Sequence, residues 1–370
     1  MNELQTLTQQ VLWGFFFGAF ALGWISQRTH FCTMGAVADV VNMQDWTRAR
    51  QWLFAIGLAM VGFASLTSLG LIDPSKTLYA TPKWLWLSTL VGGLMFGYGM
   101  VMSSGCGNKT LIRIGTGNLK SLVVFLVMGL SAFATLKGIT AVLRVNTVDS
   151  FAVEMTSGAN LGTWVAALLG LPANQAFTLT GFVLGGVLIV TVLRHVDFWS
   201  FENFLAGVGV GTLVTAMWWV SGHLGFVAEH PETLDAVYVG TASTRIEAFS
   251  FVAPIAHSLD WLMFYSDKTK VLTVGVMAVV GVISGSTASS LLDKSFRWEG
   301  FANVEDLANH LTGAVLMGVG GVTALGCTIG QGLSGLSTLS LNAVVATAAI
   351  VAGAVLAIRH QVARLERELD

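Results

Sequence analysis

Three cysteines carry most of the chemistry that this sequence offers, and two of them directly follow a glycine. Cys106 lies in SSGCGNKTLIRIGTG, Cys327 in GCTIGQGLSG and Cys32 in WISQRTHFCTMGAVADV. A thiol is a weak hydrogen-bond donor and acceptor, is polarizable, and can exchange with sulfane sulfur once it is deprotonated. Three thiols along one route would therefore suit a solute that contains sulfur.

The residues around the two Gly-Cys pairs favour binding of an anion. Backbone N–H groups at a helix start carry partial positive charge, and glycine keeps them accessible. Lys109 and Arg113 are four residues apart, so they share one face of a helix that starts after Cys106. Arg28 precedes Cys32, whereas the motif around Cys327 is uncharged. The candidate substrate-binding residues, acting through backbone or side chain, are Arg28, Gly105, Gly107, Asn108, Lys109, Thr110, Arg113, Gly326, Thr328, Gly330 and Gln331.

Each of these assignments has a structural alternative. A free cysteine often behaves as a small buried hydrophobic residue, and basic residues such as Lys109 and Arg113 also accumulate in cytoplasmic loops without any binding role. The odd number of cysteines, without CxxC or Cys/His zinc spacing, indicates free thiols. The seven histidines show no metal-ligand spacing, so we predict neither a metal site nor a cofactor.

The composition defines the environment in which these motifs operate. Of the 370 residues, 54% are hydrophobic and only 11% are charged, which lies far outside the range of a soluble domain. The formal net charge of -2 offers no basic surface for nucleic acid. We therefore predict an all-α integral membrane protein that contacts lipid and has no polynucleotide partner.

Nine apolar runs are long enough to predict membrane-spanning helices. They are 11–25, 51–72, 84–104, 119–144, 176–193, 203–221, 271–291, 309–326 and 338–358. A tenth run, 161–171, is too short to span. The first run lacks a basic n-region and a cleavage site, so we expect a retained helix rather than a signal peptide. The pairs Trp84/Trp86 and Trp218/Trp219 are expected to lie at the membrane interfaces.

Basic residues predict the orientation of these helices. With nine spans, the loops that contain Arg48, Lys120 and Lys294 lie on one side of the membrane, and this side is richer in Lys and Arg than the other. The positive-inside rule then places the N-terminus outside and the C-terminus in the cytoplasm.

An internal repeat relates the two Gly-Cys motifs. Aligning Cys106 with Cys327 places Gly92, Gly97, Gly99, Val101 and Gly105 over Gly313, Gly318, Gly320, Val322 and Gly326. The helix before Cys106 should run inward and the helix before Cys327 outward, so the two halves are inverted. The glycine-rich segments GGLMFGYG and GAVLMGVGG should be helix-packing faces. We expect a single transmembrane domain made of a first half (1–145), a linker with the fifth span (146–200), a second half (201–358) and a cytoplasmic tail (359–370).

Inverted repeats with broken helices are typical of transporters. Irregular backbone at membrane depth is tolerated only where it is buried in protein or lines a polar cavity. Each Gly-Cys break is therefore predicted to be a re-entrant loop that opens a short helix, and the two loops should bring Cys106 and Cys327 together on a central path. Cys32 has no counterpart in the second half and should lie near the cytoplasmic side unless its loop folds back.

Taken together, QRTHFCTMG, SSGCGNKTLIRIGTGNLKS and GCTIGQGLSG resemble the motifs of the YeeE/YedE family of sulfur-transport membrane proteins, and the likeness covers most of the chain. The resemblance implies an hourglass-shaped bundle in the bacterial inner membrane that takes up thiosulfate and passes it along by S–H hydrogen bonds. By motif position it implies Cys106 and Cys327 as the central relay and Cys32 as a third point. It also implies a TusA-like cytoplasmic sulfur carrier as a partner.

The chain departs from this family pattern at two positions. Lys109 occupies the second glycine position of Gly-Cys-x-x-Gly, which Gly330 retains in the later motif, and Thr116 replaces an acidic residue. Relatives are also associated with selenium metabolism. The leading hypothesis is a non-enzymatic importer of thiosulfate or a related small sulfur anion. The alternatives are a transporter of a selenium compound, a membrane sulfurtransferase that delivers persulfide sulfur to a cytoplasmic carrier, and a selective channel.

Overall fold

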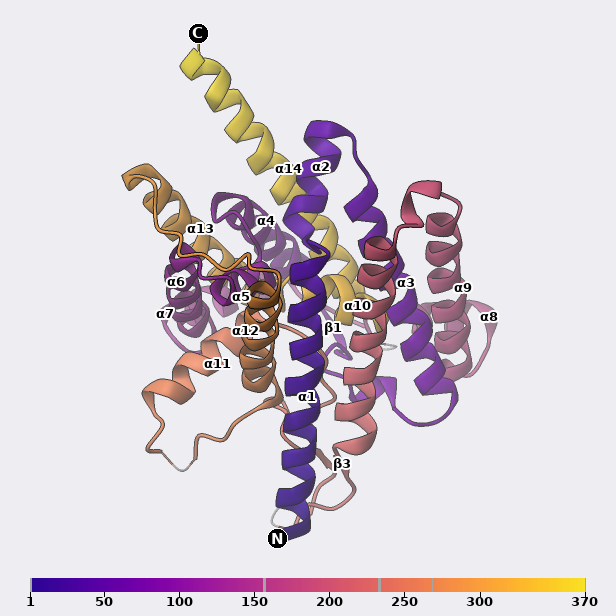
Figure 1. Ribbon diagram of the computed structural model, residues 1–370. Helices are drawn as coiled ribbons and strands as arrows, with labels where there is room; N and C mark the ends of the chain where they lie inside the picture. The colour runs from indigo at the N-terminus through magenta and orange to yellow at the C-terminus, as the bar shows by residue number, and fades with distance from the viewer. Residues whose placement is uncertain (1, 156–157, 232–233, 268, 370) are drawn as a thin grey trace.

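The computed structural model describes residues 2–155, 158–231, 234–267 and 269–369, which form a bundle of helices of unequal length (Figure 1). The α-helices are α1 (Asn2–Arg28), α2 (Thr33–Met43), α3 (Thr47–Ser68), α4 (Trp86–Met102), α5 (Gly107–Gly115), α6 (Leu119–Lys137), α7 (Ile139–Asn146), α8 (Leu161–Leu169), α9 (Ala173–Leu193), α10 (Phe201–Trp219), α11 (Val252–Met263), α12 (Val274–Leu292), α13 (Val304–Thr323) and α14 (Leu341–Leu369). Two short antiparallel pairs join connecting segments: β1 (Lys83–Trp84) with β2 (Val153–Glu154), and β3 (Phe226–Val227) with β4 (Val237–Tyr238).

Seven helical segments of the described ranges are long and apolar enough to cross a membrane, so the protein is a multi-pass membrane protein. They are Thr47–Ser68, Trp86–Gly115, Leu119–Lys137, Ala173–Leu193, Phe201–Leu224, Val274–Leu292 and Leu341–Arg367. Every one of the nine apolar runs contains a helix. Two of these helices are not in the set of seven: α1, which has polar ends, and α13, whose first turn carries Glu305 and Asp306.

Two sequence predictions about the helices are wrong. The run 119–144 is not one helix, because α6 ends at Lys137 and the extended Gly138 (φ -106°, ψ -154°) separates it from α7. Trp218 does not lie at a membrane interface. It is fully buried, and its indole N–H donates to the Ser337 hydroxyl at 3.0 Å. Trp219, the next residue, is 39% exposed.

The glycine-rich faces of α4 and α13 pack backbone to backbone, as the sequence predicts. A Cβ atom on Gly92 would lie 2.7 Å from the carbonyl oxygen of Gly320, and one on Gly99 would lie 2.6 Å from that of Gly313. Because glycine lets helices approach this closely, the two helices that lead into the Gly-Cys motifs are held together along their length.

The other helices pair in a reciprocal pattern. In Figure 1, α1 runs beside α12 and α10 runs beside α3, and these are extensive contacts. The last helix, α14, packs against α4, while α6 packs against α13. Each of these four pairs therefore joins a helix of the first part of the chain to a helix of the second part. Outside this pattern, α9 packs against α3 and α8.

Candidate functional site

Each of the three cysteines directly precedes a helix. Cys32 caps α2, Cys106 caps α5, and Cys327 precedes the helical residues 328–337, whose central part is the π-helix η5 (Gly330–Gly335). The Cys32 sulfur accepts the N–H of Gly35 at 3.5 Å, and the Cys327 sulfur accepts that of Gly330 at 3.4 Å. A thiol thus lies at each of three helix N-termini, and each N-terminus has partial positive charge.

The turns before Cys106 and Cys327 have the same geometry. Ser104 and Leu325, each two residues before its cysteine, adopt positive φ values of 56° and 62°. The N–H of Gly105 then bonds the carbonyl of Met100, five residues back, and Gly326 bonds Gly321 in the same way, both at 2.8 Å. A left-handed residue followed by this backward bond is the usual way to end an α-helix. The sequence repeat is therefore reproduced as a repeated local structure.

The structure brings the three thiols together inside the bundle. The exposed fractions are 6% for Cys32, 2% for Cys106 and 0% for Cys327, and all three are free thiols. Cys106 is the central member, because it lies close enough to interact electrostatically with both other cysteines. It also faces Thr328, whose buried hydroxyl has no hydrogen bond of regular geometry. Cys32 therefore belongs to the same site, and its segment folds back into the bundle.

The short helix α5 after Cys106 carries two basic side chains, Lys109 and Arg113. Lys109 is half-buried and interacts electrostatically with Cys32, Cys106 and Arg113. Within the described ranges neither Lys109 nor Arg113 forms an ion pair, whereas Arg48 pairs with Asp39 at 3.2 Å. Unpaired cations beside buried thiols can neutralise part of the charge of a bound anion.

The remaining candidates differ in their environments. Arg28 ends α1 with an exposed side chain, and no contact places it at the thiols. The Thr110 hydroxyl is used locally, since it donates to the Cys106 carbonyl at 3.0 Å. Asn108 and Gln331 are buried, and each has a side-chain oxygen without a hydrogen bond; the Gln331 amide donates to Ala324 at 2.9 Å. Gly105 and Gly326 lie against the side chains of the residues that follow them in the short helices.

The sequence did not predict that α2 and Arg48 lie at this site. A Cβ atom on Gly35 would lie 2.3 Å from Nη1 of Arg48, so the guanidinium covers the first turn of α2. The signal was present in the sequence, because Cys32 and Cys327 both open the pattern Cys-Thr-x-Gly. The glycine three residues after the thiol supplies the N–H that the sulfur accepts in both places.

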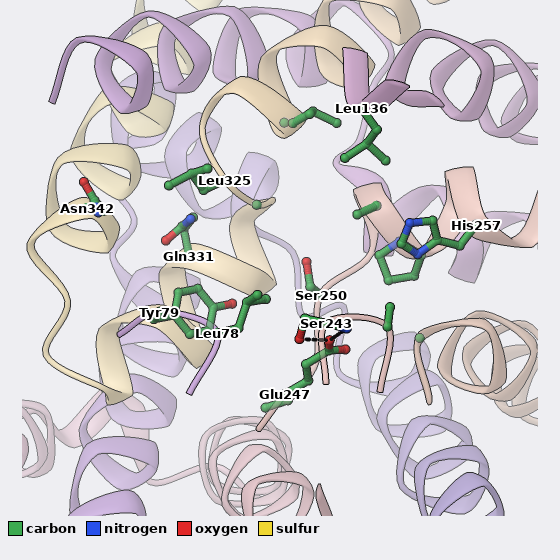
Figure 2. Close-up of a pocket in the computed structure, with 18 of the residues that line it drawn as sticks. Leu78, Tyr79, Leu136, Ser243, Glu247, Ser250, His257, Leu325, Gln331 and Asn342 are labelled. Carbon is green, nitrogen blue, oxygen red and sulfur yellow. Dashed lines mark hydrogen bonds between the residues drawn. The ribbon is translucent and has the colours of Figure 1, made fainter. Parts of the chain in front are cut away.

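A cavity of about 470 Å³ reaches the second Gly-Cys turn from one side. Its lining includes Gly326 and Gln331 from that turn and, as Figure 2 shows, Tyr79, Glu247 and His257 from other segments. The Tyr79 hydroxyl donates to the carbonyl of Gly330 at 2.6 Å, which joins the cavity wall to the short helix after Cys327. A solute in this cavity would therefore be next to the thiol site.

The comparisons with known proteins identify the family to which the chain belongs. A family model described as "Sulphur transport" matches residues 28–356, so the chain belongs to the sulfur transport family, the YeeE/YedE family that the motifs indicated. The members with which it is compared are transporters and not enzymes.

Two curated relatives carry the name thiosulfate transporter TsuA. The chain is 27% identical over 341 residues to the protein from Escherichia coli (strain K12), which covers 87% of this chain and 86% of the relative. It is 26% identical over 353 residues to the protein from Spirochaeta thermophila, which covers 93% of this chain and 97% of the relative. The family and these relatives support transport of a sulfur-containing anion.

Proposed function

We propose that this protein imports thiosulfate across the bacterial inner membrane and that Cys327, Cys106 and Cys32 pass the ion along by hydrogen bonds. The observation that carries the proposal is the cluster of three buried free thiols at three helix starts, with Cys106 close to both others. The names of the two relatives support thiosulfate as the substrate.

The site can lower the cost of burying an anion without holding it tightly. An anion in a nonpolar interior is costly unless hydrogen bonds and charges replace its water. Helix N-termini supply partial positive charge, each S–H supplies a weak donor, and Lys109 supplies a formal charge that no acidic residue of the described ranges neutralises. Several weak contacts in sequence favour passage, because each site must release the ion to the next.

We further infer that the bundle consists of two inverted halves, hourglass-like in shape, with nine spans and two re-entrant Gly-Cys loops. The reciprocal helix pairs support this, since α1 with α12 corresponds to α10 with α3. The first half is 1–145, the linker 146–200 and the second half 201–358, and residues 359–370 are the cytoplasmic tail. In this orientation the N-terminus is outside and the cavity beside Cys327 faces outward. A TusA-like carrier would receive sulfur on the opposite, cytoplasmic side.

Uptake of labelled thiosulfate tests the proposal in cells that lack other importers of sulfur anions. Cys106→Ser replaces the S–H donor with an O–H donor on a shorter side chain. We expect at least about tenfold slower uptake, because a donor that no longer reaches the anion loses a hydrogen bond to a charged group, which costs about 1.5–3 kcal/mol. Thr191→Ala on the peripheral α9 is the control, and membrane levels of each variant are measured in parallel. Wild-type uptake by Cys106→Ser would remove the thiol from the mechanism.

The sulfurtransferase alternative makes a different prediction. A covalent relay would leave a persulfide on a cysteine after incubation with thiosulfate, detectable by mass spectrometry as an added sulfur atom. Hydrogen-bonded passage leaves all three thiols unmodified. If a well-expressed wild-type protein gives no thiosulfate uptake, the substrate assignment is wrong, and uptake of selenium compounds is the next measurement.

A further inference from the structure

The cavity beside Cys327 contains an acidic side chain where an anion would have to pass. Glu247 lines the cavity together with Gly326 and Gln331 of the second Gly-Cys turn (Figure 2). Its carboxylate accepts hydrogen bonds from the backbone N–H of Ser243, at 2.9 Å, and from the Ser243 hydroxyl. No basic side chain of the described ranges forms an ion pair with it.

The charged and titratable groups around Glu247 do not neutralise it. The guanidinium of Arg245, two residues away, donates to the carbonyl of Ala80 at 3.0 Å. Arg144, on the cavity wall, already pairs with Asp149 at 3.0 Å. The carboxylate of Glu247 thus has hydrogen bonds but no cationic partner in the part of the chain that the structure describes.

Two further titratable groups line the same cavity. Tyr79 interacts electrostatically with both Glu247 and Cys327, and its hydroxyl bonds Gly330. It therefore lies near both the carboxylate and the second thiol. His257 is the other group, and burial lowers its pKa, so it stays neutral at neutral pH. Neither group adds positive charge that would offset the carboxylate.

A charged carboxylate at this position would repel a dianion, whereas a protonated one would present an O–H donor to it. Burial also raises the pKa of Glu247, with the Ser243 hydrogen bonds opposing part of that rise. The neutral form is therefore reached at a higher pH than for an exposed glutamate.

We propose that Glu247 is a proton-binding site of the cavity and that it must be protonated before the sulfur anion can pass to Cys327. The inference rests on the proposed function, since it concerns entry of that same anion. The proton comes from water in the cavity and adds to the carboxylate oxygen, and no covalent bond to the anion forms. Uptake is then linked to the pH on the side that the cavity faces.

The sign of the pH dependence follows directly. Below the pKa of Glu247 the carboxyl is neutral and uptake is maximal, and uptake falls as the pH rises through that pKa. One titrating proton limits the fall to about tenfold per pH unit. The titration should follow the external pH if the cavity faces outward.

Initial rates of labelled thiosulfate uptake between acid and alkaline external pH test this for wild type and Glu247→Gln. The glutamine keeps the shape and stays neutral, so we expect it to hold the acid-side rate at all pH values. Asp267→Asn changes an exposed acidic residue that follows α11, and it should keep the wild-type profile. The inference is overturned if Glu247→Gln follows the wild-type profile, or if His257→Gln abolishes the pH dependence and Glu247→Gln does not.

A second variant decides the matter if Glu247→Gln does not reach the membrane. Ser243→Ala removes one hydrogen bond that stabilises the charged carboxylate, so the fall in uptake should move to higher pH, and an unmoved fall would count against Glu247. The failure of the transport proposal looks different. In that case the wild type takes up no thiosulfate at any pH, whereas failure of this inference alone leaves uptake that depends on Cys106 but not on Glu247.

Discussion

Gly92 of α4 and Gly320 of α13 lie in reciprocal backbone contact, because a Cβ atom on either residue would be 2.7 Å from the carbonyl oxygen of the other. In the sequence repeat, Gly92 corresponds to Gly313 and Gly99 to Gly320. Gly99 and Gly313 form the second such contact at 2.6 Å. The repeat therefore relates the contact between Gly92 and Gly320 to the contact between Gly313 and Gly99. This is expected for two equivalent helices that cross about a pseudo-two-fold axis.

This contact predicts a sharp difference between glycines. Gly320→Leu should separate α4 from α13, displace both Gly-Cys turns and destabilise the protein by about 1–3 kcal/mol or more, as overpacking of a close interface does. Gly186→Leu on α9 is the control, since no atom lies within 4 Å of a Cβ atom there. The unfolding temperature in detergent and the rate of thiosulfate uptake should both fall for Gly320→Leu only. Equal effects of the two variants would contradict the packing role.

The central position of Cys106 predicts an order among the thiol variants. Cys106→Ser changes the thiol that lies near both other cysteines, so its uptake should be the slowest. Cys327→Ser should follow, and Cys32→Ser should retain the most activity, because Lys109 and Arg48 remain at that end of the route. Initial rates normalised to membrane level give the ranking. If Cys32→Ser is instead the slowest variant, the step that limits uptake does not take place at Cys106.

Lys109 should act on binding more than on the maximal rate. Lys109→Gln removes a half-buried cation that forms no ion pair with any described residue. A lost charge-assisted hydrogen bond of about 1.5–3 kcal/mol corresponds to a roughly tenfold or larger rise in the thiosulfate concentration for half-maximal uptake. Lys83→Gln, an exposed residue paired with Glu154, serves as the control and should behave as wild type. If the concentration dependence of Lys109→Gln is unchanged, this lysine does not bind the substrate and contributes only to the orientation of the helices in the membrane.

The tryptophan pair gives a prediction about stability. Trp218→Phe removes the hydrogen bond to Ser337, which follows η5, and leaves the buried hydroxyl with a local bond only. We expect a loss of about 1–3 kcal/mol from this bond and from the smaller ring. Trp219→Phe, at a 39% exposed position, should cost much less. Thermal unfolding of both variants in the same detergent compares them directly, and equal costs would contradict the burial argument.

Several features could be read from the sequence because they depend on local chemistry. Hydropathy over about twenty residues located all nine runs that contain helices, and the glycine spacing located the α4–α13 interface. The breaks at Gly105-Cys106 and Gly326-Cys327 were visible because glycine and an interrupted apolar run coincide there. The same averaging did not predict the break between α6 and α7 at Gly138, because one residue in a long apolar run hardly changes the mean hydropathy of a window.

Other features depend on residues that are distant in the chain. Cys32 lies 74 positions before Cys106, and only the path of α1 and α2 brings the two thiols together. Glu247, Tyr79 and Gln331 come from three separate segments, and no local pattern predicts that they share a cavity. Helix α2 escaped prediction because eleven residues are too few for a spanning signal.

The sequence by itself determined that this is a helical membrane protein with three free thiols, a Gly-Cys motif that occurs twice, and an anion-favouring helix start after each motif. These properties follow from composition, spacing and local backbone preference. Only the tertiary structure decided that Cys106 lies near both other thiols and that Lys109 lies near two of them. It also decided that Glu247, which forms no ion pair with any basic residue of the described ranges, lines the cavity beside the second Gly-Cys turn. These properties depend on how distant helices pack, because side-chain neighbours in a bundle are set by the helix pairs and not by position along the chain.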